Sequence, residues 1–187
     1  MHNVAEEITG EWLRYIKGCN FVEYNVKGPH QTEIDVIGLK MAENTIYVCE
    51  VAAHVQGLQY VNTKTSQPNT ANKFIQKFKK DKDYIDKHFP HFKKNYMLWS
   101  PVVKVSRTGA KYNALQAVKD VQLQLQRELQ IQLELVVNEH YLAAINQLKE
   151  YASNISYDLS KSAVLRYLQI EGCLQKYASK LKEENKL

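Results

Sequence analysis

The strongest constraint on the fold is a pair of short, β-branched runs between residues 32 and 54, TEIDVIGLKMAENTIYVCEVAAH. Such runs are typical of strands, and a turn residue such as Asn44 between them indicates a hairpin. The first strand carries Asp35 and the second carries Glu50. Because side chains alternate along a strand, Glu50 and Ala52 are expected on one face, with both acids near the same end of the hairpin.

The setting of Glu50 predicts a partner of opposite charge. This acid lies in the apolar run VCEVAA, where an unpaired carboxylate is costly to bury. Oxygen ligands from Asp35 and Glu50 would suit Mg²⁺ or Mn²⁺. The alternative is that both acids lie on the solvated face of a sheet edge and need no partner.

The motif EIDVIG, a hairpin and the motif VCEVA together resemble the core of the PD-(D/E)XK nuclease superfamily, in particular its Mrr-like and Holliday-junction-resolvase-like branches. The resemblance covers residues 1–137, and its specific part is confined to 33–52. It implies that Asp35, Glu50 and the carbonyl of Val51 bind the metal. It also implies hydrolysis of phosphodiester bonds in DNA, with RNA as an alternative substrate.

The chain departs from the family pattern at Ala52, where the family has a lysine that positions or activates the attacking water. Some branches of the superfamily supply this amine from the helix after the glutamate strand. The resemblance therefore makes Lys73 and Lys77, in a helix predicted over 70–88, the candidate catalytic lysines. Their spacing does not choose between them.

Three further residues are candidates for the site. The resemblance assigns Glu7, in the first helix, to the metal, and places Gln31, in the loop before the Asp35 strand, near the scissile phosphate. His54 lies two residues after Ala52 and is a candidate base or phosphate contact. The alternatives are that Glu7 is a solvated helix acid and that His54 caps the strand.

The net charge of +5 is concentrated in one segment. Residues 73–94 contain eight lysines and three aspartates, so this segment accounts for the whole net charge. A basic element beside an acidic metal site suits a phosphodiester substrate, although a lysine-rich helix is also an ordinary soluble surface. Lys64, Lys80 and Arg107 are predicted to contact nucleic acid, together with Gln31 and His54.

Length and composition restrict the class of protein. A chain of 187 residues suits one domain with a sizeable core. It has no apolar run long enough to span a membrane and no apolar signal region at its start, so we expect a cytoplasmic protein. The three cysteines lack CxxC spacing and the six histidines lack ligand spacing, which argues against a disulfide framework and a zinc site.

The pattern along the chain predicts an α/β fold with a mixed sheet of about five strands flanked by helices and a C-terminal helical extension. The resemblance implies that this fold is restriction-endonuclease-like. Helices are predicted over 4–17, 70–88, 110–130, 139–153 and 154–187, and strands over 21–27, 36–39, 46–49, 96–103 and 133–137. The strand–helix–strand order after residue 96 predicts two parallel strands. In the helix at 139–153, Leu142 is expected on the inner face.

The C-terminal segment 154–187 is predicted to be a separate helical unit after a nuclease-like domain at 1–153. Its helix is expected to be capped near Ser160. An apolar stripe with 4-3-4-3-4 spacing follows, made of Ala163, Tyr167, Ile170, Leu174, Tyr177 and Leu181. This spacing is typical of a helix that packs on its own domain or pairs with a second copy in a homodimer.

The expected function is a metal-dependent DNA nuclease acting in repair, restriction or defence. One alternative is a catalytically inactive nuclease fold that only binds nucleic acid, which Ala52 favours and the presence of both acids opposes. The second alternative is a non-enzymatic assembly protein that acts through its C-terminal helices. In that protein the two acids would be incidental.

Overall fold

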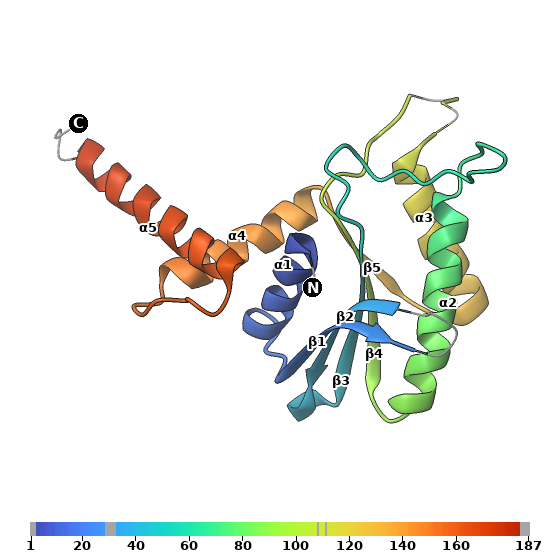
Figure 1. Cartoon of the computed structure of the whole chain (residues 1–187), viewed down its shortest axis with the longest axis horizontal. Coiled ribbons are helices and arrows are strands. Elements are labelled where there is room, and N and C mark those ends of the chain that lie inside the picture. Colours follow the sequence, from blue (N-terminus) through green and yellow to red (C-terminus); the bar gives the residue numbers. More distant parts are fainter. Residues whose placement is uncertain (1–2, 29–32, 108, 111, 184–187) are drawn as a thin grey trace.

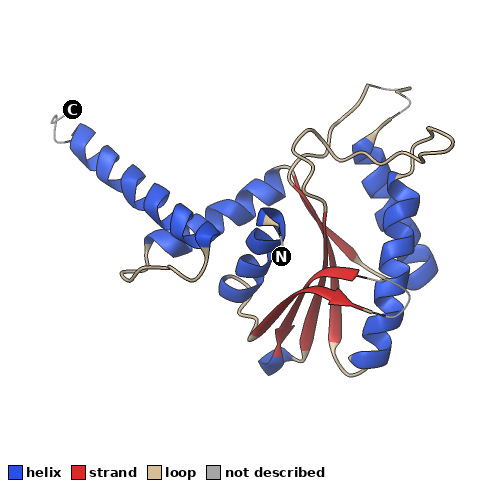
Figure 2. Cartoon of the chain, viewed as in Figure 1, coloured by secondary structure: helices blue, strands red, loops and turns tan. Residues whose placement is uncertain are grey.

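Five strands form one mixed sheet in the order β1-β2-β3-β4-β5, flanked by helices on both faces, in the computed structural model of the chain (Figure 1, Figure 2). The structure describes residues 3–28, 33–107, 109, 110 and 112–183. The α/β fold, the number of strands and the C-terminal helical extension agree with the prediction from sequence.

The helices and strands have the following bounds. The strands are β1 (Phe21–Lys27), β2 (Glu33–Lys40), β3 (Thr45–Val51), β4 (Lys93–Ser100) and β5 (Leu133–Val137). The helices are α1 (Val4–Tyr15), α2 (Thr70–His88), α3 (Ala114–Leu129), α4 (Glu139–Ser153) and α5 (Ala163–Glu183), with the short 3-10 turn η2 (Met41–Glu43). No helix among the described residues is both long enough and apolar enough to cross a membrane.

The sheet has an antiparallel half and a parallel half. Strand β2 pairs antiparallel with both β1 and β3, while β3, β4 and β5 run parallel. Parallel neighbours need a crossover connection, and here α2 and α3 provide it. The predicted parallel pair, β4 and β5, is confirmed.

The predicted hairpin is present, and a left-handed residue closes it. Asn44 follows η2 with a φ of 45°, and its backbone N–H donates to the carbonyl of Met41 at 3.1 Å. Asparagine tolerates this left-handed conformation better than most residues. The turn fixes the β2–β3 register, in which Lys40 faces Thr45 and Leu39 faces Ile46.

Each face of the sheet is covered by a different set of helices (Figure 1). Alternate residues of β3 point to opposite sides, so Ile46 and Val48 join one core and Cys49 joins the other. The first core includes the buried side chains of α2 and α3. The second core lies against α1 and α4, where Trp12 and Trp99 make an edge-to-face contact with 5.1 Å between ring centroids.

Several predicted element boundaries differ from those observed, and two of them have a clear local cause. Strand β4 ends at Ser100, before Pro101, because proline has no N–H to donate to the next strand. Helix α3 begins at Ala114 rather than 110, because the side chain of Asn113 accepts a hydrogen bond from the N–H of Gln116 at 3.1 Å and caps it there.

The C-terminal helices differ from the prediction in two details. Leu142 was expected on the inner face of α4, but it is 57% exposed, because the buried side of α4 is formed by Tyr141, Ala144, Leu148 and Ala152. The cap of α5 is Ser162 rather than Ser160, since the Ser162 hydroxyl oxygen accepts from the N–H of Leu165 at 3.2 Å.

Candidate active site

Strands β2 and β3 separate at Asp35. Their register runs from Lys40 opposite Thr45 to Val36 opposite Cys49. At the next position, the N–H of Val51 donates its hydrogen bond to Oδ2 of the Asp35 side chain, at 2.7 Å. A carboxylate thus replaces a backbone acceptor at the end of the ladder. This bond holds Asp35 beside the carboxyl end of β3.

Glu50 is buried beneath α2. Its side chain has no exposed surface, and its neighbours along the same face of β3, Val48 and Ala52, belong to the core under α2 and α3. The predicted shared face of Glu50 and Ala52 is therefore confirmed. The alternative of two acids on a solvated sheet edge is wrong for Glu50, and Asp35 keeps only 14% of its side chain exposed.

Lys77 from α2 joins the two acids. Its ammonium nitrogen lies 3.0 Å from Oδ1 of Asp35 and forms an ion pair with Oε2 of Glu50. Burial by itself lowers the pKa of Lys77, but the charges of Glu50 and Asp35 and the hydrogen bonds to them outweigh burial and raise it well above the usual value. Lys77 is therefore a fixed positive charge in this arrangement and not a proton acceptor.

Lys73, one turn earlier on α2, has a different environment. Its ammonium lies 3.4 Å from the centre of the Tyr60 ring, and the hydroxyl of Tyr60 lies 2.9 Å from Nε2 of His54. Burial and the nearby charge of Lys77 lower the pKa of Lys73. Of the two candidate lysines, Lys77 contacts the acids. Lys73, Tyr60 and His54 form a separate cluster beside the acids.

Asp81 is a buried acid of this site that the sequence analysis did not identify. It lies one turn after Lys77 on α2, has no exposed surface, and its carboxyl group is within hydrogen-bond reach of Glu50. Its surroundings in the sequence, KKDKD, suggest a solvated charge. However, Phe74, Phe78, Asp81 and Ile85 share the 4-3-4 spacing of the buried face of α2. That spacing predicts that the Asp81 side chain is buried with the apolar face of α2.

Burial controls the protonation of the Glu50 and Asp81 pair. Burial, together with the charges of Asp81 and Asp35, raises the pKa of Glu50 well above its usual value. Burial likewise raises the pKa of Asp81 to about 7, against the opposing effects of its hydrogen bond to Glu50 and the charge of Lys77. Burial therefore favours the protonated form of both carboxyl groups.

Replacing Asp81 by asparagine is expected to stabilise the protein at alkaline pH. Between about pH 4 and pH 7 folded Asp81 binds a proton that the unfolded chain releases, so wild-type stability falls as the pH rises through this range. Asparagine does not titrate, so the variant does not lose stability in this way as the pH rises. Thermal unfolding should give a variant more stable than wild type by about 2 kcal/mol at pH 8, or roughly 5 °C, and a much smaller difference at pH 4.

The matched control for this prediction is Asp83→Asn, which makes the same change at an exposed position of α2. It should leave the unfolding temperature nearly unchanged at both pH values. An equal shift for Asp81→Asn at pH 4 and pH 8 would contradict the prediction, because it would assign the effect to packing instead of charge.

The structure does not bring Glu7 to the acids. Oε1 of Glu7 accepts hydrogen bonds from the Ser162 hydroxyl at 2.8 Å and from the N–H of Val164 at 3.4 Å. Helix α1 also lies on the other face of the sheet from Glu50. Glu7 therefore connects α1 to the start of α5. Its assignment as a metal ligand does not fit this geometry.

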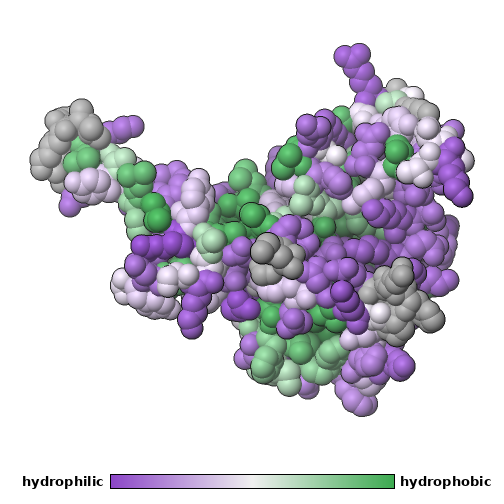
Figure 3. Space-filling model, viewed as in Figure 1, coloured by the Kyte–Doolittle hydropathy of each residue, from purple (hydrophilic) through white to green (hydrophobic). Residues whose placement is uncertain are grey.

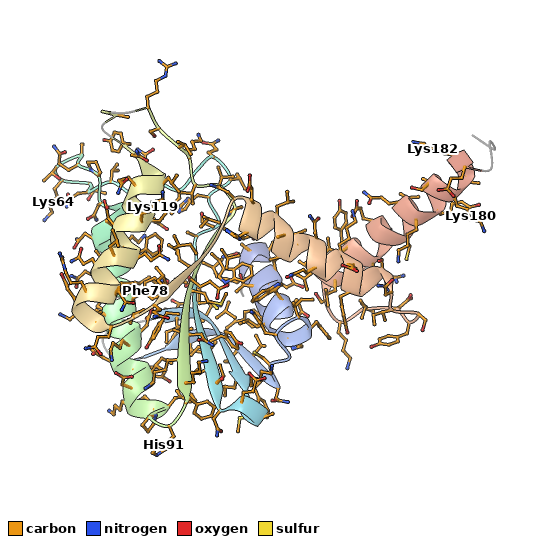
Figure 4. All side chains as sticks on the ribbon, turned by 180° about the vertical axis from the view of Figure 1, so that it is seen from behind. Lys64, Phe78, His91, Lys119, Lys180 and Lys182 are labelled. Atoms are coloured by element: carbon orange, nitrogen blue, oxygen red, sulfur yellow. The ribbon has the colours of Figure 1, made fainter. Side chains whose placement is uncertain are left out.

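Three of the residues predicted to contact nucleic acid, Lys64, Lys80 and Arg107, have exposed side chains. Gln31 lies outside the described residues. Lys64 is on the loop between β3 and α2, at the end of the molecule opposite His91 (Figure 4). Lys80 is on the exposed side of α2, and Arg107 is exposed on the loop that follows β4. Among the described residues, no hydrogen bond or ion pair joins Lys64, Lys80 or Arg107 to Asp35 or Glu50, so these three residues are separate from the acids.

A cavity lies at the carboxyl ends of the parallel strands, and Asp35, Glu50 and Lys77 do not line it. It has a volume of about 460 Å³ and lies between the loops after β3 and β4 and the first turns of α2 and α3. Its lining includes the amide side chains Gln56, Gln59, Asn72, Asn113 and Gln116. Ligands of α/β proteins commonly bind at this edge of the sheet. The cavity thus leaves room for a ligand beside the helix that carries Lys77.

The acids of the site fit a small divalent cation, although the arrangement is incomplete. Asp35 and Glu50 converge on the positive charge of Lys77, and Oε1 of Glu50 has no hydrogen-bond partner among the described residues. Mg²⁺ is commonly held by one or two carboxylates and several waters. Among the described residues, no group of three or more histidine, cysteine or acidic side chains is placed to hold a metal. Binding of a cation between these acids would therefore require Lys77 to move aside.

Comparison of the chain with protein-family models, curated proteins and solved structures gives no match. The function is therefore inferred from the geometry of Asp35, Glu50 and Lys77.

Proposed function

We propose that the protein is a metal-dependent nuclease of the PD-(D/E)XK type that hydrolyses phosphodiester bonds in DNA. The observation that carries this proposal is the contact of Lys77 with both Asp35 and Glu50. A lysine from α2 occupies the position beside the two acids that the family pattern gives to the residue at Ala52. The three charged groups of the pattern are then all present, with one supplied by a different element.

The order of elements supports the same proposal. The chain begins with a helix and three antiparallel strands, continues with a helix, and adds parallel strands. This is the order that the resemblance implies for the core. The helix after the glutamate strand is also the element from which some branches supply the lysine. Topology by itself does not assign an activity, so the proposal depends on the site.

In the proposed mechanism, Asp35, Glu50 and the carbonyl of Val51 would hold Mg²⁺ or Mn²⁺. The metal would supply Lewis-acid polarisation of the phosphate and a water of lowered pKa. Lys77 leaves its position between the acids and places its permanent charge beside the phosphate, where it stabilises the negative charge that develops. Its flexible stem allows this movement, and its side chain is 30% exposed.

The surroundings of the site favour a polyanionic substrate. Lys73 lies one turn from Lys77, and the segment 73–94 carries an excess of five positive charges. Lys64, Lys80 and Arg107 lie on exposed surfaces. Contacts of this kind bind phosphates with little dependence on base sequence, and they weaken as the salt concentration rises.

A second candidate function is binding of nucleic acid without cleavage. The closed ion-pair arrangement of Asp35, Lys77 and Glu50 favours it, because three charges that satisfy one another leave little net charge to attract a metal. In this case the acids would act as structural supports for α2. The two functions differ in their response to divalent cations.

The decisive experiment is cleavage of a panel of plasmid, linear, single-stranded and branched DNA, with an RNA of matched length, in Mg²⁺ or Mn²⁺. We expect the wild type to cut at least one DNA substrate only with the metal. Glu50→Gln, which keeps the shape of the side chain, should lower the rate about 10³-fold. The matched control is Glu43→Gln, at an exposed acid that pairs with Lys40.

Two outcomes would contradict the proposed nuclease, and a third would change its substrate. If the wild type retards DNA on a gel but cuts nothing, the second candidate function is correct. If cutting persists in Glu50→Gln, the activity does not come from this site. Cutting of RNA alone would keep the mechanism and change the substrate.

A further inference from the structure

Helix α5 has two apolar faces on opposite sides. One face buries Leu165, Leu168 and Gly172, and it packs mainly against α4. The other carries the stripe predicted from sequence, of which four members are 55–67% exposed: Tyr167, Ile170, Leu174 and Tyr177. At 3.6 residues per turn these two sets lie on nearly opposite sides of the helix. The stripe therefore does not pack on its own domain, because the opposite face does.

The second half of α5 extends beyond the rest of the molecule. The helix runs away from the sheet, and Lys180 and Lys182 lie near its far end (Figure 1, Figure 4). None of the residues 173–183 is buried, although the segment contains Leu174 and Tyr177. Figure 3 shows hydrophobic side chains along this projecting helix. An isolated helical segment of this length is marginal in water, which indicates that a partner stabilises it.

We propose that the exposed stripe is a homodimer interface, in which α5 of a second copy packs against it in the antiparallel direction. The 4-3-4-3-4 spacing of the stripe reads the same from either end. Two copies related by a two-fold axis that crosses the stripe midway between Ile170 and Leu174 therefore place Tyr167 opposite Tyr177, and Ile170 opposite Leu174. Such self-complementarity is what a symmetric contact between identical chains requires.

The charges that flank the stripe are compatible with this contact. The stripe itself contains no charged residue. Arg166 beside it already pairs with Asp158 at 2.6 Å, and Glu171 pairs with Lys149 at 2.7 Å. Association would therefore not bury an unpaired charge. An uncharged, tyrosine-containing surface also fits a second copy better than it fits a nucleic acid, which would require free cations along the helix.

The exposed area of the stripe predicts a dimer of modest affinity. The two tyrosines and the two aliphatic residues together offer roughly 400 Å² on each helix, about half of the 800 Å² per partner in a standard interface. Flanking side chains add to this area. We therefore expect dissociation constants of order 1–10 µM rather than an obligate dimer.

The test is the oligomeric state of the full chain in solution, measured by light scattering and sedimentation from about 1 to 100 µM. The wild type should approach twice the 21.7 kDa of the monomer. Leu174→Asp and Tyr177→Asp should each raise the dissociation constant about 100-fold or more, because each change is made in both copies. The matched control is Ser179→Asp, an exposed residue on the other side of α5, which should leave the dimer intact.

Cys173 provides a second measurement. It is an exposed thiol directly before Leu174, whereas Cys19 and Cys49 are buried. In the proposed pair both copies of Cys173 lie near the two-fold axis, so a short bis-maleimide should cross-link wild-type chains and should not cross-link Leu174→Asp. A wild type that stays monomeric at about 100 µM would overturn the proposal, as would a dimer that both stripe variants leave unchanged. The proposal does not depend on nuclease activity.

Discussion

Replacing Lys77 by methionine is expected to lower metal-dependent DNA cleavage about 10³-fold. Methionine has a similar reach but no charge, so it fills the space beneath α2 without stabilising the charge on a phosphate. Lys73→Met, one turn away, should lower the rate much less, because Lys73 contacts Tyr60 and not the acids. Single-turnover cleavage of the same DNA by both variants measures the difference.

Thermal unfolding separates this catalytic role from a structural one. Lys77→Met leaves Glu50 buried without its cation, which is expected to destabilise the fold by about 3–5 kcal/mol in the absence of metal. Added Mg²⁺ should then stabilise the variant more than the wild type, because the ammonium no longer competes for the acids. A variant that cuts as fast as wild type would show that Lys77 only supports the structure.

Asp35→Asn is expected to abolish cleavage, again by about 10³-fold, while leaving DNA affinity unchanged or a few-fold higher. Asparagine keeps a side-chain oxygen that can accept from the N–H of Val51, so the end of β3 should keep its position. It removes one negative charge close to where a phosphate would lie. Cleavage in Mg²⁺ and fluorescence anisotropy of labelled DNA without metal measure the two effects separately.

The control for Asp35→Asn is Asp83→Asn, which changes the net charge by the same amount at an exposed position of α2. It should cut like the wild type. If Asp35→Asn lowered affinity and cleavage together, the acid would be needed for the shape of the binding surface. If it changed neither, the site assignment would be wrong.

Much of the fold could be predicted because its signals are local. The bounds predicted for α2, β1, β5 and α4 agree with the structure, and the hairpin around Asn44 forms as its turn residue indicates. Errors occurred where caps and packing set the ends, as at Asn113 for α3. Leu142 was misplaced because the apolar spacing in α4 allows two faces, and only contact with the sheet selects one.

The candidate site was predicted only in part. Asp35 and Glu50 were found because acids in apolar strands are unusual, and Lys77 was one of two equivalent candidates. Asp81 was missed because its lysine-rich neighbours suggest solvent, and Glu7 was assigned by family resemblance although its partner is Ser162. In each case the deciding contact joins residues that are distant in sequence.

The sequence by itself determined the alternation of the strands, the turn, the buried face of α2 and the apolar stripe of α5, because each depends on the spacing of neighbouring residues. Only the tertiary structure decided which lysine contacts the acids, which carboxyl groups are buried near one another and which face of α5 remains exposed. Asp35 and Lys77, which are 42 positions apart in the sequence, show the reason. Their contact depends on how α2 packs across the sheet, and once they are buried, weak screening makes their charges interact strongly.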